Sequence, residues 1–253
     1  MIPPVPRSPY PARLASVAAI VLGSIVAGAP AKAQNQYMDI PAEAEAKRSP
    51  AYVYANMTNA EALAELKTRG IPFKPATPPL PGVRAPIRLT GKLHGVWLHS
   101  ALPPEKREDS IFEILDARLA LALDDFCRIL AAHDIVEVVH FTMYRPPRDE
   151  PSDAEGYRFR HPGGLAFDFG AAKKRNGQWL AIGPHWAEQI GAKTCGKRAR
   201  RIENRKGREL RSIVCEAYDQ RLFHYSLTPH YDAPHADHLH LELKPDTKWF
   251  VAH

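Results

Sequence analysis

The chain has 253 residues and a formal net charge of +6, with 45% hydrophobic and 25% charged residues. These values are ordinary for a globular protein and leave room for one sizeable domain with extensions. They exclude the composition of a disordered chain, which is poor in hydrophobic residues and strongly charged.

The first 33 residues show the order of regions found in a secretory signal peptide. Arg7 and Arg13 precede an apolar run at 14–28, and residues 31–33 (AKA) offer a small-x-small cleavage site. The run has about 15 residues, fewer than a spanning helix needs, so a membrane anchor is the weaker alternative. Cleavage would remove three basic residues and lower the net charge to +3. We therefore expect a periplasmic or secreted protein with no stable membrane span after cleavage.

Residues 34–86 are predicted to be an N-terminal linker with one short helix and a proline-rich connector. Thr58 and Glu61 have the spacing of a capping box, and Gly70 is a plausible end of the helix that follows. Six prolines then lie between residues 71 and 86, which excludes a continuous helix there. The main domain is expected to span residues 87–253.

The main domain mixes strand and helix patterns without regular alternation. A strand-like stretch covers 87–98, leucines recur at helical spacing over 110–133, and β-branched residues predict a strand at 136–144. A helix can begin at 186–190, and 239–243 alternates as a last strand. This order predicts an α+β fold, which we expect to be a small antiparallel sheet flanked by helices.

Three cysteines allow one disulfide and leave one thiol. Cys127 lies in the helical pattern and is expected to be a buried thiol. Cys195 and Cys215 flank a polar segment, and an exported protein meets an oxidising compartment. We predict a Cys195–Cys215 disulfide.

The segment 193–211 holds nine basic and two acidic residues. Such a run can bind nucleic acid, anionic lipid or an anionic polymer. It contains no aromatic residue on which single strands could stack, and the expected export also argues against nucleic acid. Two interpretations stay open: a solvated flexible loop, and a surface that docks on an anionic cell-wall polymer.

Two segments far apart in the sequence together carry the donors for a metal ion. Residues 161–168 (HPGGLAFD) offer His161 and Asp168, and residues 235–240 (HADHLH) offer His240. Catalytic zinc takes three such ligands and keeps one position open. Non-haem iron also uses two histidines and a carboxylate, but usually takes its first two ligands from a tight His-x-Asp/Glu motif, so zinc is favoured.

The second segment also offers acid and base groups beside the donors. His238 and His240 are two residues apart, so on a strand they would point the same way. In a regular strand Asp237 would point to the opposite side from His238 and His240. It reaches the same side only if the chain bends between Asp237 and His238. Taken alone, His-x-His is often a surface pair, Asp237 a loop cap, and Arg145 a structural arginine at a strand end.

These residues resemble a known group of enzymes. The pattern His161-x-x-Gly164-x-Ala166-x-Asp168, followed by Asp237-His238-x-His240, is similar to the zinc peptidases that cut D-amino-acid bonds in peptidoglycan. That group includes D-Ala-D-Ala carboxypeptidases and murein endopeptidases. Within it, residues 58–243 most resemble the bacterial extensin-like C-terminal family.

The resemblance implies a role for each matching residue. His161, Asp168 and His240 match the zinc ligands, and Asp237 matches the general base. Arg145 matches an arginine that binds a substrate carbonyl or carboxylate.

His235 and His238 match histidines beside the metal that assist proton transfer or orient other groups. The resemblance implies a zinc peptidase-like catalytic domain at 87–253, with the zinc site on the sheet and peptidoglycan peptides as substrate. The alternative is a non-catalytic cell-wall-binding protein that kept the fold.

Overall fold

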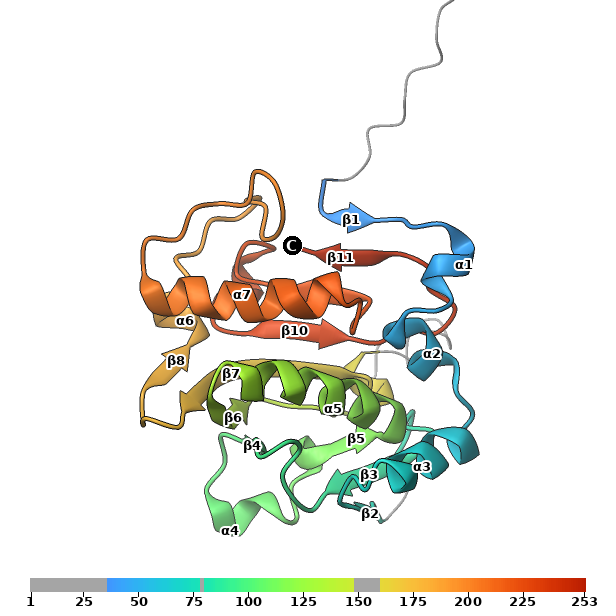
Figure 1. Ribbon diagram of the computed structural model, residues 1–253. Coiled ribbons are helices and arrows are strands. Elements are labelled where there is room, and N and C mark those ends of the chain that lie inside the picture. Colours follow the sequence, from blue (N-terminus) through green and yellow to red (C-terminus); the bar gives the residue numbers. More distant parts are fainter. Residues whose placement is uncertain (1–35, 78–79, 148–159) are drawn as a thin grey trace, which may run out of the picture. The chain divides into compact units, whose positions relative to one another are not determined.

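The computed structural model describes residues 36–77, 80–147 and 160–253. They form a mixed α/β structure with an eight-stranded sheet, a separate three-stranded sheet and several helices (Figure 1). The expected signal peptide, residues 1–33, lies outside the described residues. No described helix is long and apolar enough to cross a membrane.

Strands and helices alternate irregularly along the chain. The strands are β1 Met38–Asp39, β2 Phe73–Pro75, β3 Pro86–Leu89, β4 Trp97–Ser100, β5 Ile114–Asp116, β6 Ile135–His140, β7 Ala166–Lys174, β8 Trp179–Ala181, β9 Tyr225–Leu227, β10 Leu239–Glu242 and β11 Phe250–Ala252. The α-helices are α1 Glu43–Ala46, α2 Pro50–Asn56, α3 Asn59–Thr68, α4 Pro104–Arg107, α5 Ala117–Ala132, α6 Ile182–His185 and α7 Arg205–Asp219. Short 3₁₀ turns are η1 Ile111–Glu113, η3 His161–Gly163 and η4 Ala233–His235.

The large sheet has the strand order β1-β11-β9-β10-β7-β6-β4, and β8 also pairs with β7. Its centre is antiparallel, but β4 pairs with β6 and β11 with β9 in parallel. The expected small antiparallel sheet is therefore wrong in size and in its two parallel pairs. The chain between β4 and β6 includes the long helix α5, and such a crossover lets neighbouring strands run in the same direction.

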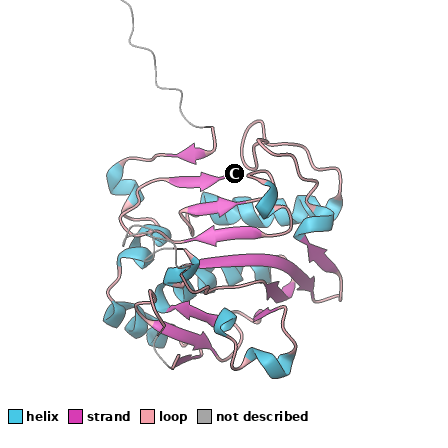
Figure 2. Ribbon diagram, turned by 180° about the vertical axis from the view of Figure 1, so that it is seen from behind, coloured by secondary structure: helices cyan, strands magenta, loops and turns pink. Residues whose placement is uncertain are grey.

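The two long helices, α5 and α7, cover one face of the large sheet, as the front and back views show (Figures 1 and 2). On that face the ring of Phe126 in α5 meets the ring of Phe169 in β7 edge to face. Leu239 of β10 is directly opposite Phe169 and is equally buried. Because side chains alternate along a strand, Asp168 and His240 point to the other face of the sheet.

The segment before β3 is more structured than the expected linker with one helix. It forms three helices, and buried residues of α2 and α3, such as Ala55 and Leu66, belong to the same core as α5. The predicted capping box is present: Thr58 and Glu61 bond each other's backbone at the start of α3. Apolar packing on α5 thus orders a segment whose composition alone suggested a linker. The domain boundary at 86 stays a prediction.

Other elements differ from the sequence expectation in their bounds. The strand-like stretch 87–98 splits into β3 and β4. The long helix begins at Ala117 rather than near 110, because residues 114–116 pair with β3 and Asp116 caps the helix. Trp186 ends α6 instead of opening a helix. The pattern predicted neither β7 nor α7.

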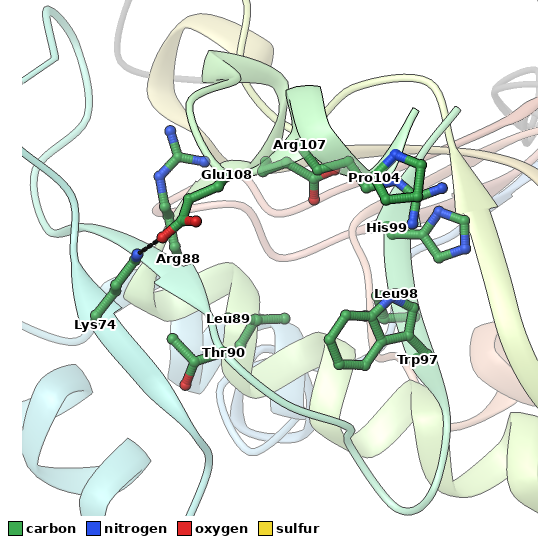
Figure 3. A pocket seen from close by; sticks show the side chains of 11 residues that line it. Lys74, Arg88, Leu89, Thr90, Trp97, Leu98, His99, Pro104, Arg107 and Glu108 are labelled. Carbon is green, nitrogen blue, oxygen red and sulfur yellow. Dashed lines mark hydrogen bonds and ion pairs between the residues drawn. The ribbon is translucent and has the colours of Figure 1, made fainter. Parts of the chain in front are cut away.

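The small sheet, β2-β3-β5, lies beside α4 and β4. A cavity of about 400 Å³ is lined by residues of these elements and of η1 (Figure 3). The three residues His161, Asp168 and His240 do not line it.

Candidate metal centre

His161 lies in a tight loop whose shape depends on glycine. The 3₁₀ turn His161–Gly163 ends at Gly164, which has a left-handed φ of 64°. A Cβ atom at Gly164 would be 2.8 Å from the backbone nitrogen of Asp116. That nitrogen donates to the Gly164 carbonyl at 2.9 Å, so the loop packs directly on the start of α5. Glycine is required here for both the conformation and the close approach.

Asp168 and His240 come together through the register of two central strands. In the antiparallel pair β7 and β10, His240 is directly opposite Asp168. Directly opposite side chains lie on the same face, about 5 Å apart at Cβ. Both point away from the helix-covered face and toward the His161 loop.

The three side chains form a compact, buried cluster. Asp168 Oδ1 lies 3.0 Å from His161 Nε2 and 3.1 Å from His240 Nδ1. One ligand atom from each residue lies within 4.8 Å of the others, and all three residues are buried. Two imidazole nitrogens and one carboxylate oxygen are donors that zinc accepts. The cluster could therefore hold a metal ion.

The atoms of the cluster that face outward have partners that fix the side chains. His161 Nδ1 lies 3.4 Å from the Met143 carbonyl oxygen, and His240 Nε2 lies 3.0 Å from Glu242 Oε2. Arg145 Nη2 donates to Asp168 Oδ2 at 3.1 Å. Each donor group is thus oriented from behind, as in proteins whose metal ligands are held by outer hydrogen bonds.

The electrostatics of the cluster favour a cation. Burial disfavours the ionised form of Asp168, but hydrogen bonds from His161 and His240 outweigh burial and hold the pKa of Asp168 well below its usual range. Burial also favours neutral His240, yet hydrogen bonds to Asp168 and Glu242 prevail and raise its pKa to about 9. Burial lowers the pKa of His161. Two carboxylates therefore hold a proton on His240, and a metal ion that binds there must displace it.

The turn before β10 carries the other predicted residues. Asp232 caps η4 and bonds the His235 ring at Nδ1. The His235 ring lies 5.1 Å from the His238 ring and 5.8 Å from the His240 ring, centroid to centroid. His238 Nε2 lies 3.6 Å from Asp168 Oδ1. Both histidines therefore border the cluster.

Asp237 lies in this turn and not in the strand. The chain turns at Ala236 and Asp237 and the strand begins at Leu239, so the alternation of strand side chains does not apply to Asp237. The carboxylate of Asp237 is 65% exposed and bonds His238 Nδ1 at 2.9 Å. Among the described residues, Asp237 connects with the cluster through His238.

A family comparison places this site in a known domain. Residues 82–252 match the model of the extensin-like protein C-terminus. The chain belongs to this family. No curated protein and no solved structure matches it. The extensin-like domain includes all three cluster residues and the turn before β10.

Sequence reasoning missed one member of the extensin-like site, Glu242. Its side chain is 2% exposed, and its Oε2 atom binds the outer nitrogen of His240. Arg160 Nε lies 3.7 Å from the same oxygen. The signal was available, because Glu242 follows His240 by two residues and so shares its face of the strand.

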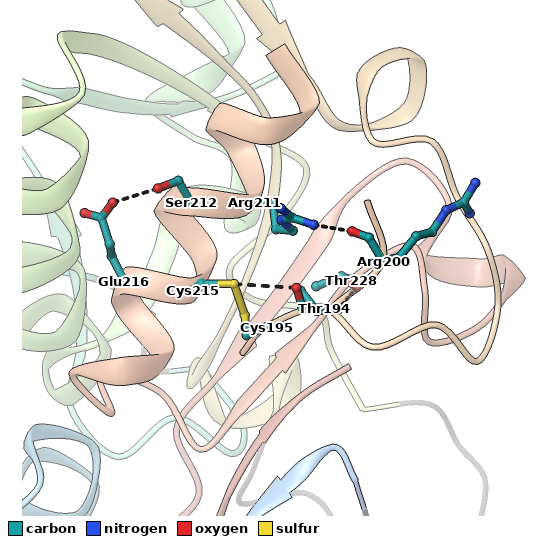
Figure 4. The surroundings of a disulfide bond; sticks show 8 residues. All are labelled: Thr194, Cys195, Arg200, Arg211, Ser212, Cys215, Glu216 and Thr228. Atoms are coloured by element: carbon teal, nitrogen blue, oxygen red, sulfur yellow. Dashed lines mark hydrogen bonds between the residues drawn. A yellow bond between two sulfur atoms is a disulfide. The ribbon is translucent and has the colours of Figure 1, made fainter. Parts of the chain in front are cut away.

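The predicted Cys195–Cys215 disulfide is present and joins the basic segment to α7 (Figure 4). Cys127 is a buried free thiol. Several arginines of the segment bind main-chain carbonyls: Arg200 that of Glu188, Arg208 that of Glu203, and Arg211 that of Arg200. Part of the positive charge therefore holds the loop in shape. The exposed basic residues are Lys197, Arg198, Arg201, Arg205 and Arg208.

Proposed function

We propose that this extensin-like protein is an exported zinc-dependent peptidase that hydrolyses peptide bonds in peptidoglycan stem peptides or cross-links. The observation that carries the proposal is the buried set of His161, Asp168 and His240, each oriented by an outer partner. The likeness of their spacing to zinc peptidases of D-amino-acid bonds supports the choice of reaction.

The residues present fit a zinc ion. His161 Nε2, Asp168 Oδ1 and His240 Nδ1 would hold it, and three protein ligands leave a position open. When bound, zinc supplies Lewis-acid chemistry, which polarises a carbonyl and lowers the pKa of water. Glu242 keeps the proton of His240 on Nε2 and so leaves Nδ1 free to bind the ion.

Asp237 is the proposed general base. Its exposed carboxylate accepts a proton from the attacking water and passes it to the leaving amine. His238 bonds Asp237 at Nδ1 and approaches Asp168 at Nε2, which holds the base beside the cluster. His235 packs beside His238 and supports the orientation of its ring.

Arg145 is the proposed substrate-binding residue. One nitrogen of its guanidinium bonds Asp168, and its side chain is 52% exposed. The remaining N–H groups can bind a substrate carboxylate or a carbonyl oxygen on which charge develops.

Export and a docking surface complete the proposal. The disulfide is of the kind that persists in oxidising compartments, which supports a periplasmic or secreted location. The exposed basic residues beside it form the proposed contact with an anionic cell-wall polymer. Changing Lys197, Arg198, Arg201 and Arg205 to Glu should reduce binding to isolated sacculi; unchanged binding would refute this contact.

The decisive experiment measures metal content and hydrolysis of purified muropeptides by mass analysis. We expect about one zinc per chain, products that appear without added partner, and loss of both with a chelator. Re-addition of zinc should restore hydrolysis. Binding to sacculi without any product, in a protein loaded with zinc, would instead identify a non-catalytic cell-wall-binding protein.

A further inference from the structure

A second candidate site is the cavity between the small sheet, α4 and β4. Its volume is about 400 Å³, within the range of pockets that hold small molecules. The residues that matter for its chemistry are Lys74, Arg88, Trp97, His99, Glu108 and Glu113 (Figure 3). They come from β2, β3, β4, η1 and the residue that follows α4.

Two cations lie side by side on one wall. Lys74 of β2 is directly opposite Arg88 of β3 in an antiparallel pair, so both side chains lie on the same face. Lys74 Nζ bonds Glu108 Oε1 at 3.0 Å. Arg88 Nη1 is buried and has no hydrogen-bond partner among the described residues. Like charges opposite each other destabilise a sheet, so an anion near Arg88 would be favourable.

The acidic side chains of the cavity have other partners. Glu108 binds Lys74, as stated above. Glu113 Oε1 accepts the backbone N–H of Ser100 at 2.8 Å, and its Oε2 lies 3.4 Å from the buried His140 ring. Burial lowers the pKa of Arg88, and the nearby carboxylates of Glu113, Asp109 and Glu108 act in the opposite direction. Nη1 is covered, so it is the positive charge of Arg88, and not this donor atom, that can attract an anion into the cavity.

The facing wall is aromatic. Trp97 at the start of β4 lies across the cavity from Lys74 and Arg88, with Leu89 between them on the floor (Figure 3). The residue is 38% exposed although its neighbours Leu98 and His99 are buried. An exposed indole beside a cation suits a ring that has an apolar C–H face and carries a negative charge.

We propose that this cavity binds an anionic sugar, with the carboxylate or phosphate on Arg88 and the ring on Trp97. A peptide strand is the less favoured occupant. It would have to pair with the edge strand β4, but at Ser100 the N–H is already bonded by Glu113 and the carbonyl lies 2.8 Å from His99 Nδ1. The inference does not rest on the proposed hydrolysis, because no cluster residue lines the cavity.

Calorimetric titration of the protein in the presence of a chelator tests the proposal. The probes are N-acetylmuramic acid, N-acetylglucosamine 6-phosphate and neutral N-acetylglucosamine. We expect one or both anionic sugars to bind at least about 10-fold more tightly than the neutral one. Comparing the two anionic sugars shows whether the cavity prefers a carboxylate or a phosphate. Arg88→Gln should weaken the anionic sugars about 10- to 100-fold and bring them to the level of the neutral sugar.

Variants of the aromatic wall provide the matched controls. Trp97→Ala should weaken all three sugars, and Trp97→Phe should keep most of the binding because a ring remains. Trp179, on β8, is also 38% exposed, so Trp179→Ala should leave binding unchanged. The proposal would be overturned if the neutral sugar bound as tightly as the anionic ones, or if Arg88→Gln had no effect. It would also be overturned if tri-glutamate, an anionic peptide, displaced the sugars. Because zinc is removed, failure here leaves the proposed hydrolysis untouched.

Discussion

His240 lies in β10 and His224 lies just before β9, and both are buried, but their surroundings are opposite. His240 is flanked by Asp168 and Glu242, which raise its pKa to about 9. His224 is bonded by backbone groups alone: the Lys244 N–H donates to its Nδ1, and its Nε2 lies 2.9 Å from the Thr247 carbonyl oxygen. Burial lowers the pKa of His224 to about 4.

The difference shows how one sheet can give two buried histidines opposite electrostatic surroundings. Carboxylates around His240 stabilise positive charge, so the site suits a proton or a metal ion. Backbone groups around His224 fix a neutral tautomer, with the proton on Nε2 and Nδ1 as acceptor. Burial alone therefore does not distinguish the two histidines; the partners of both ring nitrogens do.

The largest effect that tests this contrast is the loss of a ligand histidine. His240→Ala or His161→Ala should lower zinc affinity by more than about 100-fold and reduce hydrolysis to background. This exceeds the effect expected when only a residue that orients a ligand is lost. Elemental analysis and muropeptide digestion check both results. His224→Gln should keep zinc at the wild-type level; zinc loss in that variant as well would break the contrast.

Removal of the proposed base should separate turnover from metal binding. Asp237→Asn keeps the cluster intact and should lower turnover about 10²- to 10⁴-fold with unchanged zinc content. Asp219→Asn, at the exposed end of α7, is the control and should behave as wild type. Normal turnover of Asp237→Asn on purified muropeptides would reject the base assignment.

Glu242 tests whether the carboxylate beside His240 matters for the metal. Glu242→Gln keeps the size of the side chain but removes its charge, and should lower zinc affinity about 10- to 100-fold. Competition with a coloured chelator measures this, with the exposed Glu203→Gln as control. Wild-type affinity in Glu242→Gln would show that Glu242 only packs.

The last effect concerns stability at low pH and does not involve the metal. The pKa of His224 is about 4 in the folded protein and about 6.5 in the unfolded chain, so below pH 6.5 the unfolded chain binds more protons. The contribution of His224 to the free energy of unfolding is complete above pH 6.5. It falls by roughly 3 kcal/mol as the pH drops to 4. Urea unfolding from pH 8 to 4 should show a smaller decline in His224→Gln. If the free energy of unfolding fell equally with pH in the two proteins, this role of His224 would be contradicted.

Short-range patterns pointed to the three residues that the structure brings together. Residue spacing pointed to His161, Asp168 and His240, which lie together, and Asp237 lies in a turn before the strand. The polar stretch between Cys195 and Cys215 suggested the disulfide. These inferences succeeded because each depends on local geometry: the period of a strand, a glycine turn, or the closure of a short loop.

The sequence alone determined the donor types, their spacing, the disulfide pair and the membership of the extensin-like family. Only the tertiary structure decided that His240 is opposite Asp168, that the Met143 carbonyl is behind His161, and that Arg88 faces a cavity. It also decided the mixed sheet and the packing of α2 and α3 on α5. The reason is physical: alternation fixes the face on which a side chain lies, whereas register and partners depend on contacts between residues far apart in the chain.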